Sequence, residues 1–133
     1  MRCKSAINTV MSTPTAILAG GTVPIGTIIR RYGCGIEQNG NGLTILEPGY
    51  YDITVSMTVL PTAATAITAT LLRDGVAVPG ATASATPAAA GAAVNLTLKA
   101  LVRHGCNCDA ATLTAALSAA ATVNNMAVVI ERV

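Results

Sequence analysis

The residues best suited to chemistry are one histidine and two cysteines in the string HGCNCD, namely His104, Cys106 and Cys108. Thiolates beside an imidazole are zinc-type ligands. The C-x-C spacing is tighter than the usual C-x₂-C spacing of zinc sites, and one subunit supplies only three ligands unless Cys34 joins them. A metal site shared on a three-fold axis, a disulfide, and reduced thiols are the alternatives. We expect reduced, partly buried thiols, with no metal and no cofactor.

The four cysteines allow three full disulfide pairings, and the sequence does not decide among them. A Cys3–Cys34 bridge would tie an N-terminal arm to a glycine-rich loop. A Cys106–Cys108 bridge would be strained, and a bridge between subunits would lock an oligomer.

Catalysis is not expected from these residues. His104 is the only histidine, and the six acidic residues are scattered along the chain. Nucleophilic catalysis would have to pair His104 with Cys106 or Cys108, within one short loop where a third group has little freedom to orient the base. We therefore predict a protein that is not an enzyme.

Charge and side-chain size narrow the remaining functions. With 133 residues and a net charge of +2, the chain lacks the basic footprint of a nucleic-acid-binding protein. It contains no Phe, no Trp and only three Tyr, although 52% of its residues are hydrophobic. Small aliphatic side chains make a thin core, and packing against further copies of the chain is a natural remedy. We expect an oligomer without a nucleic-acid partner.

Membrane insertion is not expected, despite a mean hydropathy of +0.59. No segment offers ~20 continuous apolar residues. The segment MRCKSAINTVMSTPT has basic residues but no apolar core, so no signal peptide is apparent. We expect a place on a virion or on an extracellular or cell surface, reached by assembly, by lysis or by a route that the sequence does not reveal.

Apolar and polar residues alternate along most of the chain, which is the pattern of β-strands. In residues 50–59 the predicted core face carries Tyr51, Ile53, Val55 and Met57. Tyr50 begins the opposite, polar face, where we expect it to line a subunit contact. Near the C-terminus, Val128 and Ile130 alternate with residues that are also apolar, so this strand should be buried on both faces, either centrally or against a partner.

Glycine and proline mark the expected reversals. Asp74–Gly75 is the signal of a two-residue type I′ hairpin. Pro48–Gly49 and Pro79–Gly80 each fit a type II turn. Further reversals are expected at Gly33–Cys34–Gly35, Gly40–Asn41–Gly42 and Gly105. Many short strands with such turns predict a sandwich or barrel.

Residues 109–123, DAATLTAALSAAATV, fit two structures. Asp109 is a good N-cap and Ala is the best helix former. However, Leu113 and Leu117 also alternate with Thr, and β-branched residues favour strands. We expect a strand here.

Three segments together resemble a known family. LTILEPGYYDITVSMTV resembles the "(I/L)xxPGxYxIxxxVxV" block of bacterial C1q/TNF-like domains, such as those that cap collagen-like spore-surface filaments. TLLRDGVAVPGATAS is similar to the next block, and ALVRHGCNCDAATLTAALSAAATVNNMAVVIERV resembles the closing blocks, in the same order. The resemblance covers residues 20–133 and leaves 1–19 as an N-terminal arm. It departs from the family in having no Gly-X-Y tract and few acidic residues, which does not favour the calcium site of animal members.

The resemblance implies an all-β jelly roll of about ten antiparallel strands that assembles as a homotrimer. It implies a structural or binding module on a virion, as a head fibre, decoration or tail-associated protein, or on a bacterial surface. A spore or cell-surface adhesin and a module that recognises a glycan or receptor are the alternatives, and a small metal-binding protein is less favoured. The expected partners are further copies of the chain, with capsid or tail proteins, a receptor or a glycan as others.

Overall fold

Strands account for the regular structure of the computed structural model, which describes residues 5–105 and 110–133. The strands are β1 (Ala6–Met11), β2 (Thr15–Ile17), β3 (Thr27–Tyr32), β4 (Ile36–Asn39), β5 (Gly42–Ile45), β6 (Gly49–Pro61), β7 (Ile67–Arg73), β8 (Val76–Ala85), β9 (Val94–His104), β10 (Ala111–Leu117) and β11 (Ala121–Arg132). No helix occurs among the described residues. The prediction of a strand within residues 109–123 is therefore confirmed as β10.

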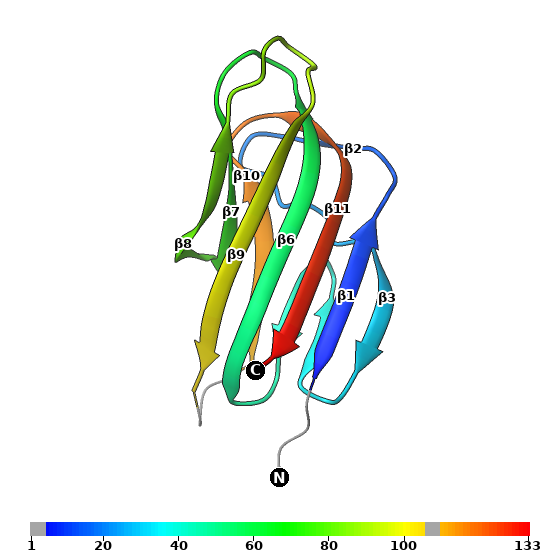
Figure 1. Cartoon of the computed structure of the whole chain (residues 1–133), viewed down its shortest axis with the longest axis vertical. Coiled ribbons are helices and arrows are strands. Elements are labelled where there is room, and N and C mark those ends of the chain that lie inside the picture. Colours follow the sequence, from blue (N-terminus) through cyan, green and yellow to red (C-terminus); the bar gives the residue numbers. More distant parts are fainter. Residues whose placement is uncertain (1–4, 106–109) are drawn as a thin grey trace.

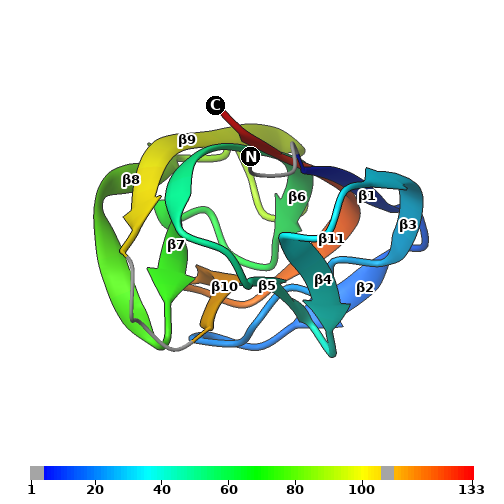
Figure 2. The ribbon, with the colours of Figure 1, turned by 90° about the horizontal axis from the view of Figure 1, so that it is seen from below.

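The strands form two antiparallel sheets that pack face to face. The long sheet has the order β3-β1-β11-β6-β9, with the short β2 also paired to β11, and the short sheet has the order β4-β5-β10-β7-β8. Figure 1 shows β9, β6, β11 and β1 running side by side across the front, and Figure 2 shows the second layer beneath them. The start of β1 and the end of β11 lie together, because Ala6 pairs with Glu131. The predicted sandwich is confirmed.

The core lies between the sheets and follows the predicted alternation. In β6 and β11 the buried residues include the predicted Tyr51, Ile53, Val55, Met57, Val128 and Ile130, each 4% exposed or less. Tyr51 is the only aromatic side chain in this core, since Tyr32 and Tyr50 are 60% and 50% exposed. Most of the core volume therefore comes from aliphatic side chains, as the composition predicts.

The hairpin between β7 and β8 has the predicted geometry. Asp74 and Gly75 are its two central residues, with φ values of 52° and 83°. Both positive values match a type I′ turn, which explains why Asp-Gly stands between these strands. Gly40–Asn41 similarly reverses the chain between β4 and β5.

Of the two predicted type II turns, only the one at Pro48–Gly49 is wrong. Pro79–Gly80 lies inside β8, where the register against β7 shifts and the strand forms a bulge. Gly80 has a φ of 79°, the value that a type II turn requires at its second central residue. Pro48–Gly49 lies where the chain passes from β5 of the short sheet to β6 of the long sheet. Gly49 has a φ of 149°, outside the value near +80° of a type II turn.

The described part of the expected N-terminal arm belongs to the sandwich. Residues 6–11 form β1, which pairs with both β11 and β3, and residues 15–17 form β2. The folded unit therefore begins before the boundary expected at residue 20. Thr9 explains the difference: it occupies a core-facing position of β1 and interrupts the apolar alternation there.

Replacing Thr9 with Val should stabilise the protein by about 1 kcal/mol. Thr9 is fully buried, and its hydroxyl has no hydrogen-bond partner among the described residues. Valine keeps the shape and removes an unpaired polar group, whose burial costs free energy. Urea unfolding should show a higher midpoint with an unchanged slope. The control is Thr58→Val, which removes a hydroxyl that donates to Asn95 Oδ1 at 2.8 Å and should bring no gain. A Thr9→Val protein no more stable than the parent would contradict this account.

Candidate functional site

The structure places His104 in the interior at the end of β9, whereas Cys106 and Cys108 lie outside the described residues. His104 is 2% exposed, and its Nδ1 lies 3.1 Å from Arg73 Nη2. A guanidinium group only donates hydrogen bonds, so Nδ1 accepts and the ring proton lies on Nε2. Residues 5–105 and 110–133 contain no group of three His, Cys, Asp or Glu side chains suited to a metal. Of His104, Cys106 and Cys108, only His104 is described, and its ring makes a structural hydrogen bond with Arg73.

The protein should lose stability as pH falls through the ordinary histidine range. Burial lowers the pKa of His104 below its usual value of 6.5, the Arg73 charge lowers it further, and Asp74 opposes both. Between the lowered pKa and 6.5 the unfolded chain binds more protons than the folded protein. The free energy of unfolding therefore decreases as pH falls through this window, and the loss is complete below the folded-state pKa.

Urea unfolding of the parent and of His104→Asn at pH 7.5, 6.5 and 5.5 measures this contribution. The variant should show a shallower fall in stability over the same range. If the unfolding free energy of the two proteins fell equally between pH 7.5 and pH 5.5, the assignment to His104 would be wrong.

Cys34 lies on the surface in the connection between β3 and β4. Its Sγ is 3.6 Å from Glu47 Oε1. The neighbouring Gly35 N–H donates to the Ser5 hydroxyl at 2.9 Å, which ties this connection to the start of β1. Cys34 is exposed and not partly buried as expected. Cys3 lies outside the described residues, so the Cys3–Cys34 disulfide stays one of the alternatives.

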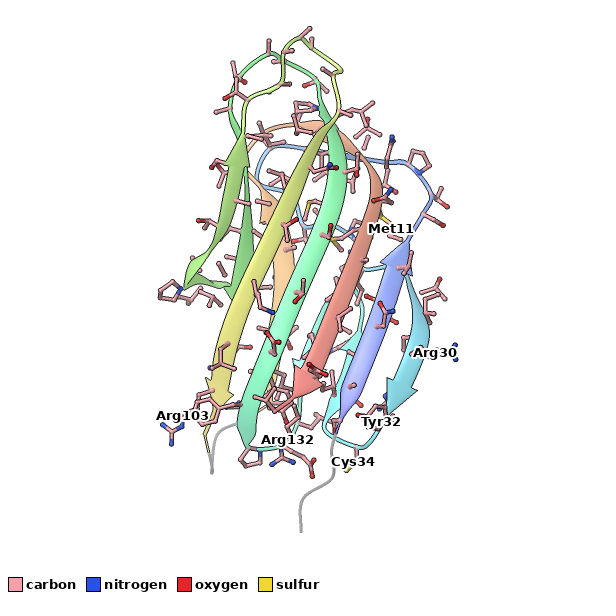
Figure 3. All side chains as sticks on the ribbon, in the orientation of Figure 1. Met11, Arg30, Tyr32, Cys34, Arg103 and Arg132 are labelled. Carbon is pink, nitrogen blue, oxygen red and sulfur yellow. The ribbon has the colours of Figure 1, made fainter. Side chains whose placement is uncertain are left out.

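The segment around Pro48–Gly49 contacts Arg132, which Figure 3 shows at the end of the sandwich. Arg132 Nη2 donates to the Pro48 carbonyl at 2.7 Å, and Nη1 lies 3.7 Å from Glu47 Oε1. Tyr51 donates its hydroxyl proton to the Glu47 carbonyl at 2.7 Å. Gly49 has a φ of 149°, which other residues rarely adopt, and a Cβ there would lie 2.7 Å from Arg132 Nε, so a substitution would strain the backbone and displace the arginine. The Glu-Pro-Gly-Tyr-Tyr string thus builds a structural junction.

The solvent side of the long sheet, here called the outer face, carries exposed apolar side chains. Tyr50 of β6 is 50% exposed, Leu101 of β9 is 64% exposed and Val129 of β11 is 41% exposed. They lie on three adjacent strands, among polar residues and a Lys99–Asp52 ion pair at 3.0 Å. As predicted, Tyr50 faces away from the core that receives Tyr51. No described residue covers this side of β11, so its two-sided apolar pattern is buried on one face only.

Sequence reasoning missed two arginines that act inside the fold. Arg73 follows Ile67, Ala69 and Leu71 on the core-facing side of β7, and Arg132 follows Val128 and Ile130 in the same way on β11. Their position in the alternation was a signal that these side chains turn inward at strand ends. Arg73 accordingly donates to the Arg103 carbonyl at 2.7 Å, and the Arg132 side chain is only 9% exposed.

No family model and no curated protein matches the sequence. Among solved structures, murine APRIL matches with a TM-score of 0.75 and 12% identity, covering 98% of this chain and 99% of that one. The globular domain of the zebrafish complement 1qA protein matches with a TM-score of 0.71 and 10% identity over 96% and 95% of the two chains. The PRD1 vertex protein P5 matches with a TM-score of 0.64 and 12% identity over 100% and 99%.

These likenesses and the two antiparallel sheets define the class of the fold. The chain is a C1q/TNF-like jelly roll, as the sequence blocks implied. The similarity covers 95% or more of each of these three neighbours. In the part of the chain that the structure describes, no helix has the length and apolarity needed to cross a membrane.

Proposed function

We propose that the protein is a non-enzymatic homotrimer that serves as a structural or binding module on a virion. The observation that carries this proposal is the outer face, where Tyr50, Leu101 and Val129 expose apolar surface on a C1q/TNF-like fold. Apolar patches rimmed by polar residues commonly mark protein contacts. The family resemblance implies a trimer, and the outer face supplies a surface for it.

The energetics favour assembly through this face. Burying a Val or Leu side chain that water otherwise reaches contributes about 1.5–3 kcal/mol. The surrounding residues are Thr54, Ser56 and four charged side chains, Asp52, Lys99, Arg103 and Glu131, of which Lys99 and Asp52 form an ion pair. Pairing the other two with charges of a neighbouring subunit would limit the cost of their desolvation. It would also cover the second apolar side of β11.

Light scattering with size exclusion tests the assembly. The protein should elute with three times the subunit mass of 13.3 kDa at micromolar concentration. Val129→Asp places a carboxylate on the outer face and should shift the mass to that of a monomer while the circular dichroism spectrum stays that of a β-protein. The matched control is Leu18→Asp, which changes a side chain that is 79% exposed beyond β2 and should leave the trimer intact. A parent protein that is monomeric would overturn the proposal.

The virion location rests on the likeness to the PRD1 vertex protein P5 over the full chain. A head fibre, a decoration protein and a tail-associated protein all fit this location, with capsid or tail proteins as partners. Immunogold electron microscopy with antibodies to the purified protein should label phage particles. Labelling of spores or cell surfaces alone would replace the proposal with the surface-adhesin alternative.

Recognition of a glycan or receptor is a second candidate, supported by the exposed Tyr50 opposite Arg103 on the outer face. Dose-dependent binding on a glycan array that is lost in Tyr50→Ala and Arg103→Ala would establish it. For the third candidate, a metal protein using His104, Cys106 and Cys108, stoichiometric zinc or iron in the purified protein is the decisive observation.

A further inference from the structure

A cavity of about 370 Å³ opens between the β7–β8 hairpin and the last part of β9. Its walls are Arg73, residues 76–79 of β8 and residues 101–103 of β9. β8 and β9 are the edge strands of the two sheets, and Figure 2 shows them beside each other along one side of the sandwich. The bulge at Pro79–Gly80 interrupts the pairing of β8 at this place. The cavity is within the usual size range of small-molecule sites.

The floor of the cavity carries a positive charge without a carboxylate partner among the described residues. Arg73 donates from Nη1 to the Arg103 carbonyl at 2.7 Å and from Nη2 to His104 Nδ1 at 3.1 Å. Both acceptors are neutral groups, and neither ion pair of the described residues includes Arg73. The adjacent Asp74 instead accepts from the Thr112 N–H at 2.9 Å.

This arrangement fixes the guanidinium group and leaves donors available. Arginine has five N–H donors, of which the two contacts use two. A part-buried cation with only neutral partners interacts most favourably with an anion, because charge-assisted hydrogen bonds are about twice as strong as neutral ones. Arg103, near the end of β9, adds a second positive charge, and Figure 3 shows its side chain extending away from the sheet.

The remaining wall is apolar and faces water. Val76 is 70% exposed and Leu101 is 64% exposed, and Val78 and Pro79 continue the same surface. Large aliphatic side chains held open beside a fixed cation suit a ligand with a negative head and an apolar body. We propose that this cavity binds a small amphipathic carboxylate, whose head group contacts Arg73 and whose chain packs on Val76, Val78 and Pro79 of β8, which lie outside the proposed trimer contact.

Titration of the full chain with octanoate, followed by calorimetry and by amide chemical shifts, tests the proposal. Octanoate should bind once per subunit and shift the amides of residues 73–79 and 101–103. Octan-1-ol lacks the charge and acetate lacks the chain, so each should bind about tenfold more weakly or worse. Equal binding of acetate would reduce the site to an anion contact and overturn the proposal, as would the absence of saturable octanoate binding.

Two variants separate the head-group contact from the apolar contact. Arg73→Gln should weaken octanoate binding about tenfold, and Val76→Ser, at an exposed position that folding does not need, should weaken it severalfold. The control is Arg30→Gln on β3, at the opposite edge of the long sheet (Figure 3), which should leave the affinity unchanged. If Arg73→Gln and Val76→Ser changed the oligomer mass while octanoate affinity stayed the same, the cavity would be a subunit contact and the proposal would be wrong.

Discussion

A Tyr51→Ala variant should lose about 3–5 kcal/mol of unfolding free energy, enough to leave the chain largely unfolded. Tyr51 is fully buried and is the only aromatic residue in the core of the described chain. Its ring fills space that the surrounding aliphatic side chains cannot close, and its hydroxyl donates to the Glu47 carbonyl at 2.7 Å. Circular dichroism and urea unfolding measure the loss.

Two neighbouring changes divide this effect into its parts. Tyr51→Phe keeps the ring and removes the hydrogen bond, so it should cost about 1 kcal/mol. Tyr50→Ala truncates a half-exposed side chain on the outer face, so it should leave subunit stability within about 0.5 kcal/mol and loosen the proposed trimer. A Tyr51→Ala protein as stable as Tyr50→Ala would show that the core does not depend on this ring.

A Gly26→Ala variant should lose about 3 kcal/mol, the second largest effect we expect. Gly26 has a φ of 79°, which disfavours any side chain. An added Cβ would also overlap the Val10 carbonyl and lie 2.7 Å from Met11 Cα. Both are backbone atoms of β1, so relief requires the strand itself to move.

Gly40→Ala is the matched control for the backbone overlap. Gly40 has a φ of 61°, but a Cβ there would meet nothing within 4 Å. It should therefore cost only the conformational penalty of about 1–2 kcal/mol. The difference between the two unfolding free energies measures the overlap with β1, and equal losses would contradict it.

The long strands were predictable because their alternation is uninterrupted. Residues 50–59 show this period without a fault, and the structure places every second side chain of this stretch in the core. The Asp74–Gly75 hairpin was predictable as well, since a two-residue type I′ turn depends on its own two residues. β1 was not predicted, because Thr9 occupies a buried position that the pattern would assign to an apolar residue.

The error at Pro48 has a physical cause. The Pro-Gly pair indicates that the local backbone bends, but not which strand the next residues will pair with. Pro79–Gly80 lies within β8, which pairs with its hairpin neighbour β7 on both sides of it. Pro48–Gly49 became a passage between sheets because residues 49–59 find their partners in β9 and β11. This outcome depends on contacts distant in sequence.

The candidate sites were less predictable than the fold. The string HGCNCD drew attention to neighbours in sequence, whereas the contact of His104 is Arg73, from the opposite sheet. Likewise the cavity joins β7, β8 and β9, and its shape depends on a bulge. The Arg73–His104 contact and the cavity both depend on which strands of the two sheets lie next to each other. No single segment of the chain specifies that arrangement.

The pairing of Ala6 with Glu131 places the start of β1 and the end of β11 at one pole of the molecule. Anything fused before β1 or after β11 would leave from one pole, while the loops at 62–66 and 86–93 occupy the other pole (Figure 1). A peptide inserted in either loop would thus lie at the pole opposite to the start of β1 and the end of β11. The same geometry suits circular permutation, with a short linker joining the old ends and new ends opened at 62–66.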